Sequence, residues 1–272
     1  MPSAPLSGKS SLVGDPTDLA SPLLPTVVVA SYKGGVWKTT LAVALAERLA
    51  WAGLRVLLVT CDDQEDARAR LGVTASHAQV ARLTRGEGTI TVLSARDSQA
   101  IDLLYRRGPE KLGLGTYDLA VVDTPPQIKG GTLPGVLLIA TVDGTDAARN
   151  LISMLKQTPK SSKVVLVKVK RDAPDNWAQS VEAIGTAAKR EPTWLQPTLP
   201  LAAPIREAHD EGRSVWALPR RGCTLECLQG FDILANHIWT TSLGRKSTWP
   251  SMPSLAKTSI HVPGWDQDDD EA

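Results

Sequence analysis

Short apolar runs of strand length recur along this chain, and segments with the spacing of amphipathic helices separate them. After a first run at Val27–Ala30, the strand-like runs are Arg55–Thr60, Thr89–Ser94, Tyr117–Asp123, Gly135–Val142 and Lys163–Lys170. Continuous apolar runs that alternate with helices are typical of parallel sheets, because helices then cover both faces. The pattern therefore predicts an α/β fold with a mostly parallel sheet and helices on both faces.

The two ends of the chain differ in composition from its middle. Residues 1–24 are rich in Ser, Pro and Leu, and residues 243–272 are rich in Ser, Pro and Asp. We expect a flexible N-terminal tail over 1–24 and a disordered acidic C-terminal tail over 243–272. The folded domain is expected over 25–242, with a helix from Thr224 to Ser242 as its last element. Earlier helices are predicted at Leu41–Trp51, Gln64–Leu71 and Asp97–Arg107.

Length, cysteine content and charge limit the class of protein. With 272 residues, 42% of them apolar, the chain can form one α/β domain with tails. Its three cysteines, Cys61, Cys223 and Cys227, form no disulfide framework, which is typical of a reducing cytosol. No apolar run approaches the ~20 residues of a membrane span, and the N-terminus lacks the order of a signal peptide. We expect a cytoplasmic protein that does not associate with a membrane.

The net charge of +1 is unevenly distributed. Five of the last seven residues are acidic, and without them 30 basic residues stand against 24 acidic ones, so the body carries +6. A mildly basic body with an acidic tail is compatible with nucleic-acid binding against which the tail competes. The alternative is that the acidic tail only improves solubility.

The first apolar run leads into a pattern that suits a phosphate ligand. The strand stops before a glycine pair, and Lys38-Thr39-Thr40 opens a helical segment. In this layout the N–H groups of the turn and of the helix N-terminus point at the anion. We expect Lys38 to reach the β/γ-phosphates and the Thr39 hydroxyl to bind Mg²⁺. The predicted nucleotide-binding residues are Lys33, Gly34, Gly35, Val36, Trp37, Lys38, Thr39 and Thr40.

Two acidic motifs follow later strands. Asp62-Asp63-Gln64 comes after the strand Arg55–Thr60, and Asp123 ends the apolar run that begins at Leu119. Either acid alone could simply cap a helix. Since an open α/β sheet places its ligand at the carboxyl ends of adjacent strands, we expect both motifs to converge on the loop. Asp123 then has the place of a Walker B acid, which holds Mg²⁺ through a water or the Thr39 hydroxyl.

Taken together, these motifs resemble the ParA/MinD family of deviant Walker-type P-loop ATPases, and within it the ParA partition branch. The family loop K-G-G-x-G-K-[ST] corresponds to Lys33–Thr39, the motif D-x-D-P-Q to Thr60–Gln64, and the Walker B segment to Val121–Pro126. Leu199–Trp216 resembles the family pattern R-E-A-x-x-x-G-x-x-[VL]-[FW]. The resemblance covers about residues 25–240 and implies a P-loop NTPase fold with ATP and Mg²⁺ as cofactors.

The resemblance also implies roles for matched positions. Lys33 would be the signature lysine that reaches the phosphates of the partner in an ATP-sandwich homodimer, Asp62 would orient the attacking water, and Lys38 would complete the catalytic set. Asp123 and Thr39 would hold the metal. In this family the ATP-bound dimer binds DNA non-specifically, a ParB-type partner stimulates hydrolysis, and the cycle moves plasmid or chromosomal cargo over the nucleoid.

Basic residues near the C-terminal helices are the candidates for DNA contact. Several ParA-like proteins have an arginine at the place of Pro204, and Arg206 is a possible substitute. Such contacts would be to phosphates and independent of DNA sequence. The alternative is a solvated basic face. The candidates are Arg206, Arg213, Arg220 and Arg221, with Lys168, Lys170 and Arg171 at the end of a strand.

Three departures from the family pattern concern hydrolysis. Trp37 replaces a loop glycine, so it is expected at a positive φ that costs ~1–3 kcal/mol, with its ring either stacked outward or occluding the loop. Thr60 replaces the first acid of the second motif, and Asp63 replaces its proline. We therefore expect ATP binding with slow hydrolysis.

Two other functions remain open at this point. One is a weakly or non-hydrolysing P-loop adaptor in DNA transfer or cargo positioning, which Trp37 and Thr60 favour. The other is a MinD-like membrane-associated switch, which needs a basic amphipathic C-terminal helix. The tail after Gly244 contains prolines and ends acidic, which disfavours that switch.

Overall fold

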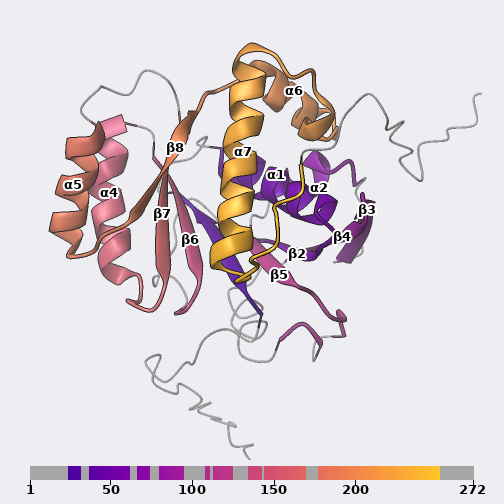
Figure 1. Cartoon of the computed structure of the whole chain (residues 1–272), viewed down its shortest axis with the longest axis horizontal. Coiled ribbons are helices and arrows are strands. Elements are labelled where there is room, and N and C mark those ends of the chain that lie inside the picture. The colour runs from indigo at the N-terminus through magenta and orange to yellow at the C-terminus, as the bar shows by residue number, and fades with distance from the viewer. Residues whose placement is uncertain are drawn as a thin grey trace, which may run out of the picture.

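An eight-stranded sheet organises the part of the chain that the structure describes (Figure 1). The computed structural model describes residues 24–31, 37–61, 66–73, 80–94, 108–110, 113–124, 134–142, 144–169 and 177–251. The strands are β1 (Thr26–Ala30), β2 (Arg55–Thr60), β3 (Val80–Arg85), β4 (Gly88–Ser94), β5 (Leu119–Asp123), β6 (Leu137–Val142), β7 (Lys163–Val169) and β8 (Thr193–Leu199). The helices are α1 (Lys38–Trp51), α2 (Asp66–Arg70), α4 (Gly144–Gln157), α5 (Trp177–Ala188), α6 (Ala203–Asp210) and α7 (Gly222–Thr241), with a short 3₁₀ turn η3 (Val215–Ala217).

The strand order is β3-β4-β2-β5-β1-β6-β7-β8. Every described pairing is parallel except β3–β4, which is an antiparallel hairpin at the sheet edge. The predicted mostly parallel α/β fold is confirmed. The sequence patterns do not predict β3, because its exposed positions alternate with half-buried ones instead of forming an apolar run. The helix predicted at Asp97–Arg107 lies outside the described residues.

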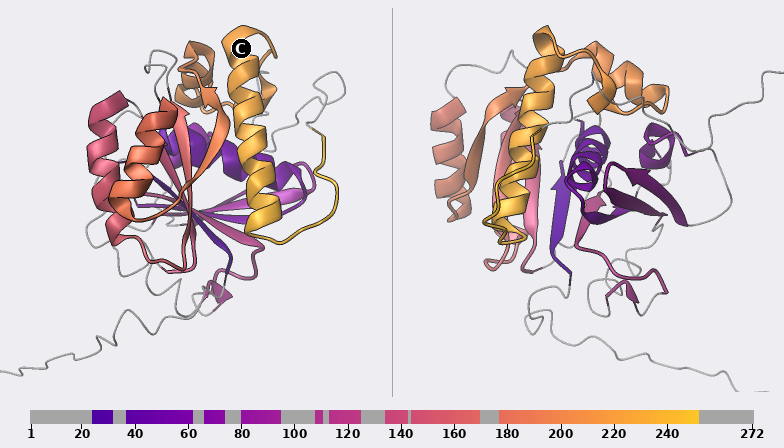
Figure 2. Two further views of the ribbon diagram at one scale, coloured as in Figure 1. Left: turned by 60° about the vertical axis from the view of Figure 1, so that its left-hand side comes forward. Right: turned by 45° about the vertical axis from the view of Figure 1, so that its right-hand side comes forward.

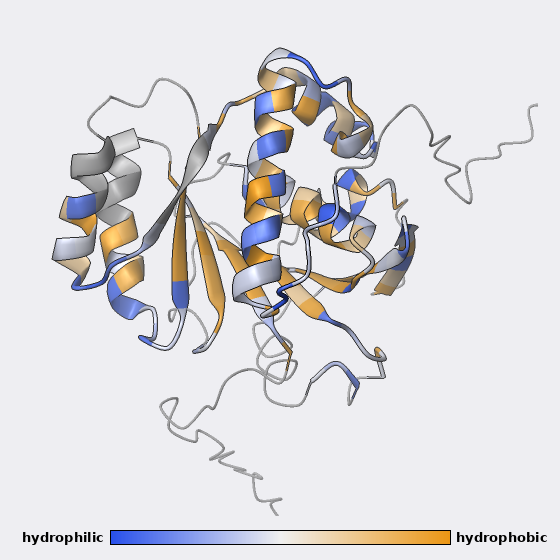
Figure 3. Ribbon diagram, viewed as in Figure 1, coloured by the Kyte–Doolittle hydropathy of each residue, from blue (hydrophilic) through white to orange (hydrophobic). Residues whose placement is uncertain are grey.

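Alternate residues of the central strands face two separate cores. In β1, Val27 and Val29 pack on the side of α1, α2, α6 and α7, while Val28 and Ala30 pack on the side of α4 and α5. Figure 2 shows these helix layers on opposite sides of the sheet, and Figure 3 shows that the central strands are hydrophobic along their length. Burial on both faces explains why these strands appear in the sequence as continuous apolar runs.

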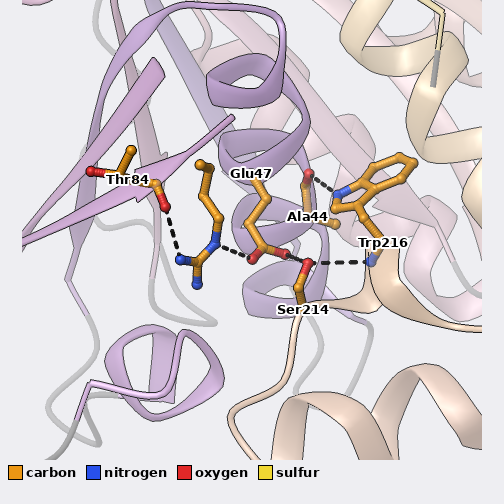
Figure 4. A network of polar contacts seen from close by, with 6 residues as sticks. Ala44, Glu47, Thr84, Ser214 and Trp216 are labelled. Carbon is orange, nitrogen blue, oxygen red and sulfur yellow. Dashed lines mark hydrogen bonds and ion pairs between the residues drawn. The ribbon is translucent and has the colours of Figure 1, made fainter. Parts of the chain in front are cut away.

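Helix α1 is buried along nearly its whole length, and a charged residue within it has partners from distant segments. The carboxylate of Glu47 is 1% exposed and accepts from Arg85 Nε of β3 and from the Ser214 hydroxyl, each at 3.0 Å (Figure 4). The indole N–H of Trp216 donates to the Ala44 carbonyl at 3.0 Å. Burial raises the pKa of Glu47, while the charge of Arg85 and the two hydrogen bonds oppose this rise. These contacts connect α1 to the sheet edge and to the segment before α7.

A second buried charge in α1 pairs with α7 and is covered by residues 243–250, which we call the C-terminal strap. Arg48 is 1% exposed, and its Nε lies 2.6 Å from Asp232 Oδ1 of α7. It also donates to the Pro250 carbonyl, and its guanidinium carbon lies 4.3 Å from the centroid of the Trp249 ring. The Trp249 indole N–H donates to the same Asp232 oxygen at 3.0 Å, and its ring packs edge-on against Trp239.

The strap differs from the tail expected from residue 243 onward. Trp249 places its ring over the buried Arg48 guanidinium and donates its N–H to Asp232, and the Pro250 carbonyl accepts a hydrogen bond from that guanidinium. A buried charge needs such partners, so this polar and proline-containing stretch is packed against α1 and α7. The rest of the expected tail, residues 252–272, lies outside the described residues.

Two truncations separate the strap from the rest of the tail. Ending the chain after residue 251 should change the free energy of unfolding by no more than about 0.5 kcal/mol. Ending it after residue 243 should lower that free energy by about 3 kcal/mol or more, since Arg48 loses its carbonyl and ring contacts. Urea unfolding of both proteins measures the difference, and equal stabilities would contradict the structural role of the strap.

Removing Arg85 should destabilise the fold in a pH-dependent way. Arg85→Ala leaves the Glu47 carboxylate buried without its cation, which should cost about 3 kcal/mol near neutral pH. Without the charge and hydrogen bond of Arg85, burial raises the pKa of Glu47 further above its value in the unfolded chain. The folded variant binds a proton at Glu47 more readily than the unfolded chain does. Its loss of unfolding free energy relative to wild type should therefore grow as the pH rises and shrink as the pH falls.

Denaturant unfolding at about pH 8 and about pH 5 tests this sign. Arg82→Ala is the matched control, because Arg82 is an exposed arginine of the same strand. A deficit of Arg85→Ala that is equal at both pH values would show that the loss is not electrostatic.

Candidate functional site

Three strand ends meet at the carboxyl edge of the sheet. β5 lies between β1 and β2, and the register places Asp123 opposite both Val29 of β1 and Thr60 of β2. Beyond the strands, the Cys61 N–H donates to the Asp123 carbonyl at 3.0 Å, and the Thr124 hydroxyl donates to the Val29 carbonyl at 2.9 Å. The segments that follow β1, β2 and β5 therefore start side by side, as the spacing of the motifs predicts.

The predicted site residues are only partly within the described chain. Those outside it are Lys33, Gly34, Gly35, Val36 and Asp62, together with Asp63. Those that the structure places at the carboxyl edge are Trp37, Lys38, Thr39, Thr40 and Asp123.

The N-terminus of α1 has the properties of an anion site. Lys38, the first residue of the helix, is 8% exposed, and Thr39 is half-buried beside it. No side chain caps this helix end, and its first turn contains no acidic residue. The first N–H groups of a helix have no partner within it, and the helix dipole is positive at this end. The terminus is therefore suited to a phosphate group.

The residues around this terminus also fit a magnesium ion. Asp123 is fully buried at the end of β5, next to the strand that leads into the loop. A hydroxyl from Thr39 and a carboxylate from Asp123 are the hard oxygen ligands that Mg²⁺ prefers, and Mg²⁺ keeps several waters besides. A site with few protein ligands is thus sufficient when phosphates complete the coordination.

Trp37 adopts the backbone that a glycine would supply, and its ring packs on α7. It is the N-cap of α1 with φ 59° and ψ 20°, in the left-handed region. Its ring centroid lies 6.3 Å from that of Phe231, which in turn lies 6.3 Å from the centroid of Trp216. The sequence predicted a ring either stacked outward or occluding the loop, and in the structure the ring is partly buried against Phe231 of α7. Packing on α7 offsets the strain of the left-handed backbone.

The substitution at Thr60 removes a carboxylate directly beside Asp123. Thr60 is 1% exposed, and its hydroxyl has no hydrogen-bond partner among the described residues. An aspartate here would have placed two carboxylates on adjacent strands, where each raises the pKa of the other. With threonine at this position, β2 contributes no carboxylate beside Asp123.

Sequence reasoning did not single out Arg70, which the structure brings to the N-terminus of α1. Arg70 ends α2, and its Nη1 donates to the Thr40 hydroxyl at 2.9 Å. Thr40 is the third residue of α1 and is 4% exposed. No sequence signal reports this contact, because the two residues lie 30 positions apart and belong to different motifs.

The predicted basic residues gather around α6 and the start of α7, but they are not equivalent. Arg206 on α6 and Arg221 at the N-cap of α7 are exposed. Arg213 is exposed and forms an ion pair with Glu211, and Arg220 is half-buried. Arg206 and Arg221 are therefore the better placed of the four for a phosphate backbone.

Other candidate residues contribute less. Lys168 is half-buried in β7, and Lys170 and Arg171 lie outside the described residues. The cysteines are free thiols, and burial raises the pKa of Cys227, so this thiol stays protonated. Within the described ranges, His, Cys, Asp and Glu side chains form no group of three or more that could hold a metal ion. The described helices are all too short or too polar to cross a membrane.

Comparison with known proteins adds a family and several relatives. Residues 27–215 match the CobQ/CobB/MinD/ParA nucleotide binding domain. The chromosome-partitioning ATPase Soj of Thermus thermophilus is 36% identical over an alignment of 121 residues, and the match covers 39% of this chain and 48% of Soj. The match thus spans about half the length of that relative.

Solved structures of low sequence identity share the fold. A complex of a McdA variant with ATP from Cyanothece has a TM-score of 0.57 and 16% identity, over 84% of this chain and 99% of that one. MinD of Aquifex aeolicus has a TM-score of 0.53 and 18% identity, over 78% of this chain and 97% of that one. MinD of Pyrococcus horikoshii, solved with Mg-ADP, has a TM-score of 0.51 and 18% identity, over 78% and 96%.

The matched residues 27–215 include the three strand ends, the N-terminus of α1 with Lys38 and Thr39, and the buried Asp123. This chain belongs to the CobQ/CobB/MinD/ParA family of nucleotide-binding domains, which includes the ParA/MinD ATPases.

Proposed function

We propose that this protein is a ParA-like ATPase of plasmid or chromosome partition. It would act as an ATP-dependent dimer switch that binds DNA non-specifically and is stimulated by a ParB-type partner. The observation that supports this proposal is that Lys38 and Thr39 begin α1 after β1, while the buried Asp123 ends β5, the strand paired with β1. The partial identity to a chromosome-partitioning ATPase supports the partition branch over other members of the family.

Each residue at the carboxyl edge has a role in this proposal. The Lys38 ammonium binds the β/γ-phosphates and neutralises charge that develops during hydrolysis. Thr39 and Asp123 would hold Mg²⁺, which would supply further neutralisation of the phosphate charge. Asp62 orients the attacking water, and Lys33 reaches the phosphates of the partner subunit; both roles rest on the family resemblance.

The proposal also includes non-specific binding to DNA. Arg206 and Arg221 are exposed on neighbouring elements, and phosphates attract such arginines without regard to sequence. DNA binding of this kind would keep the protein cytoplasmic and associated with the nucleoid. We therefore propose non-specific DNA as a partner of the ATP-bound dimer.

A second candidate is a weakly or non-hydrolysing P-loop adaptor. The observation that favours it is Thr60, which leaves Asp123 without an acidic neighbour on β2. The strained position of Trp37 no longer favours this candidate, because its ring is packed on α7. ATP turnover distinguishes the adaptor from the switch.

Turnover should depend on Lys38. The wild-type chain should hydrolyse ATP slowly, faster with non-specific DNA and a ParB-type partner, and Lys38→Ala should lose at least about 100-fold in kcat/KM because phosphate charge is no longer neutralised. Phosphate release measures this. Lys160→Ala is the control, since Lys160 is an exposed lysine in the turn before β7.

The results also separate the two candidates. ATP binding without Lys38-dependent turnover under every condition would favour the adaptor. A DNA shift that persists without ATP would contradict the dimer switch.

Changes at Trp37 should affect stability more than nucleotide affinity. Trp37→Gly loses the contact with Phe231 but relieves the positive φ, so the net loss should be about 1 kcal/mol. Trp37→Ala loses the same contact and keeps the strain, so it should be less stable than Trp37→Gly by about another 1 kcal/mol. Thermal unfolding measures this order.

Calorimetric titration with ADP should give affinities of wild type and Trp37→Gly within about threefold, because the ring packs on α7. A gain of tenfold or more for Trp37→Gly would mean that the indole obstructs the phosphate site as well.

A further inference from the structure

The charge of Arg70 is positioned by a tightly packed turn. The backbone of α2 ends with the Gly72 N–H bonded to the Ala69 carbonyl and the Val73 N–H bonded to the Arg68 carbonyl, each at 3.0 Å. A Cβ atom at Gly72 would lie 2.8 Å from the carbonyl oxygen of Gly212, which follows α6. This close approach fixes the end of α2 between α1 and α6, so the direction of Arg70 is set by the fold.

Arg70 reaches the phosphate-binding end of α1. Its Nη1 donates to the Thr40 hydroxyl at 2.9 Å, and Thr40 directly follows Thr39. The helix terminus is the positive end of the α1 dipole and has neither a side-chain cap nor an acidic residue in its first turn. Arg70 therefore adds a full positive charge beside a terminus that is already positive.

The protein supplies no counter-charge to Arg70 among the described residues. Arg48 of α1 pairs with Asp232, and Arg85 of β3 pairs with Glu47 of α1, whereas the contact of Arg70 within the described part of the chain is its hydrogen bond to Thr40. Its titratable neighbour is His209, which is 1% exposed. Burial and, to a lesser degree, the charge of Arg70 lower the pKa of His209 to about 3, so this imidazole is neutral near pH 7.

A half-buried arginine that faces a positive helix terminus, and that has no anionic partner among the side chains the structure describes, becomes more favourable when an anion binds. Guanidinium groups recognise phosphate oxygens with several N–H donors at once, so a phosphate relieves the repulsion and satisfies the free donors. Backbone N–H groups at the start of a P-loop helix contact the α/β-phosphates, whereas the loop lysine reaches the β/γ-phosphates. Thr40 thus places Arg70 closer to the diphosphate than to the γ-phosphate.

We propose that Arg70 binds the diphosphate of the nucleotide within its own chain, as a second cation beside Lys38. This inference rests on the proposed nucleotide binding and adds a binding residue to that site. Arg70 also connects the second motif to the nucleotide, because α2 follows that motif directly in the chain. Since ATP and ADP share the diphosphate, Arg70 contributes to the binding of both.

Calorimetric titration with Mg-ADP and Mg-ATP tests the proposal on the full chain. Arg70→Gln, which removes the charge and leaves a shorter polar side chain, should weaken the binding of both ligands about 10-fold or more. Arg70→Lys should recover part of the lost affinity, since it restores the positive charge but not the several N–H donors of the planar guanidinium. Arg82→Ala removes an exposed arginine charge elsewhere and should leave both affinities unchanged.

Thermal unfolding without nucleotide accompanies each titration. A variant that keeps the wild-type Tm and loses affinity supports a phosphate contact, and Arg70→Lys provides the same comparison if Arg70→Gln does not fold. Affinities of Arg70→Gln within twofold of wild type, with Lys38→Ala clearly weakened, would overturn the role of Arg70 alone. Failure of the wild-type chain to bind either nucleotide would overturn the proposed function together with it.

Discussion

The burial of α1 is the constraint on which the rest of this structure depends. The helix lies between the sheet and α7, and it contains two consecutive charged residues, Glu47 and Arg48, that are each 1% exposed. A charge removed from water must be paired and hydrogen-bonded, or it destabilises the fold. Arg85 and Ser214 satisfy the first, and Asp232 and the C-terminal strap satisfy the second. Distant segments of the chain are thus assembled around one helix, whose N-terminus is the candidate phosphate site.

This arrangement makes the N-terminus of α1 part of a larger packed unit. Trp37 at the N-cap packs on Phe231 of α7, and Trp216 joins the same aromatic group while it bonds to the Ala44 carbonyl. On the opposite side, Arg70 bonds to Thr40. The terminus is therefore held from α7 and from α2, which allows a non-glycine residue to persist at a positive φ.

The sequence predicted much of the fold and of the site, because both depend on local patterns. Buried parallel strands appear as apolar runs, and the motif that ends in Asp123 lies where a strand stops, so the convergence of three strand ends followed from topology rules. The sequence did not reveal β3, whose mixed positions carry no strong period, or the strap, whose polar residues read as a tail. Arg70 was missed because its partner lies in another motif, and only packing brings the two together.

By itself the amino-acid sequence determined the parallel α/β architecture, the family, and the order of phosphate loop, second motif and Walker B acid. These are properties of residue type and spacing, which short-range physics converts into strands, turns and helix termini. The tertiary structure alone decided where the Trp37 ring lies, which residues neutralise Glu47 and Arg48, and that Arg70 bonds to Thr40 at the start of α1. Those outcomes depend on contacts between segments far apart in the chain. Burial and charge pairing select among such contacts, and local sequence patterns do not predict them.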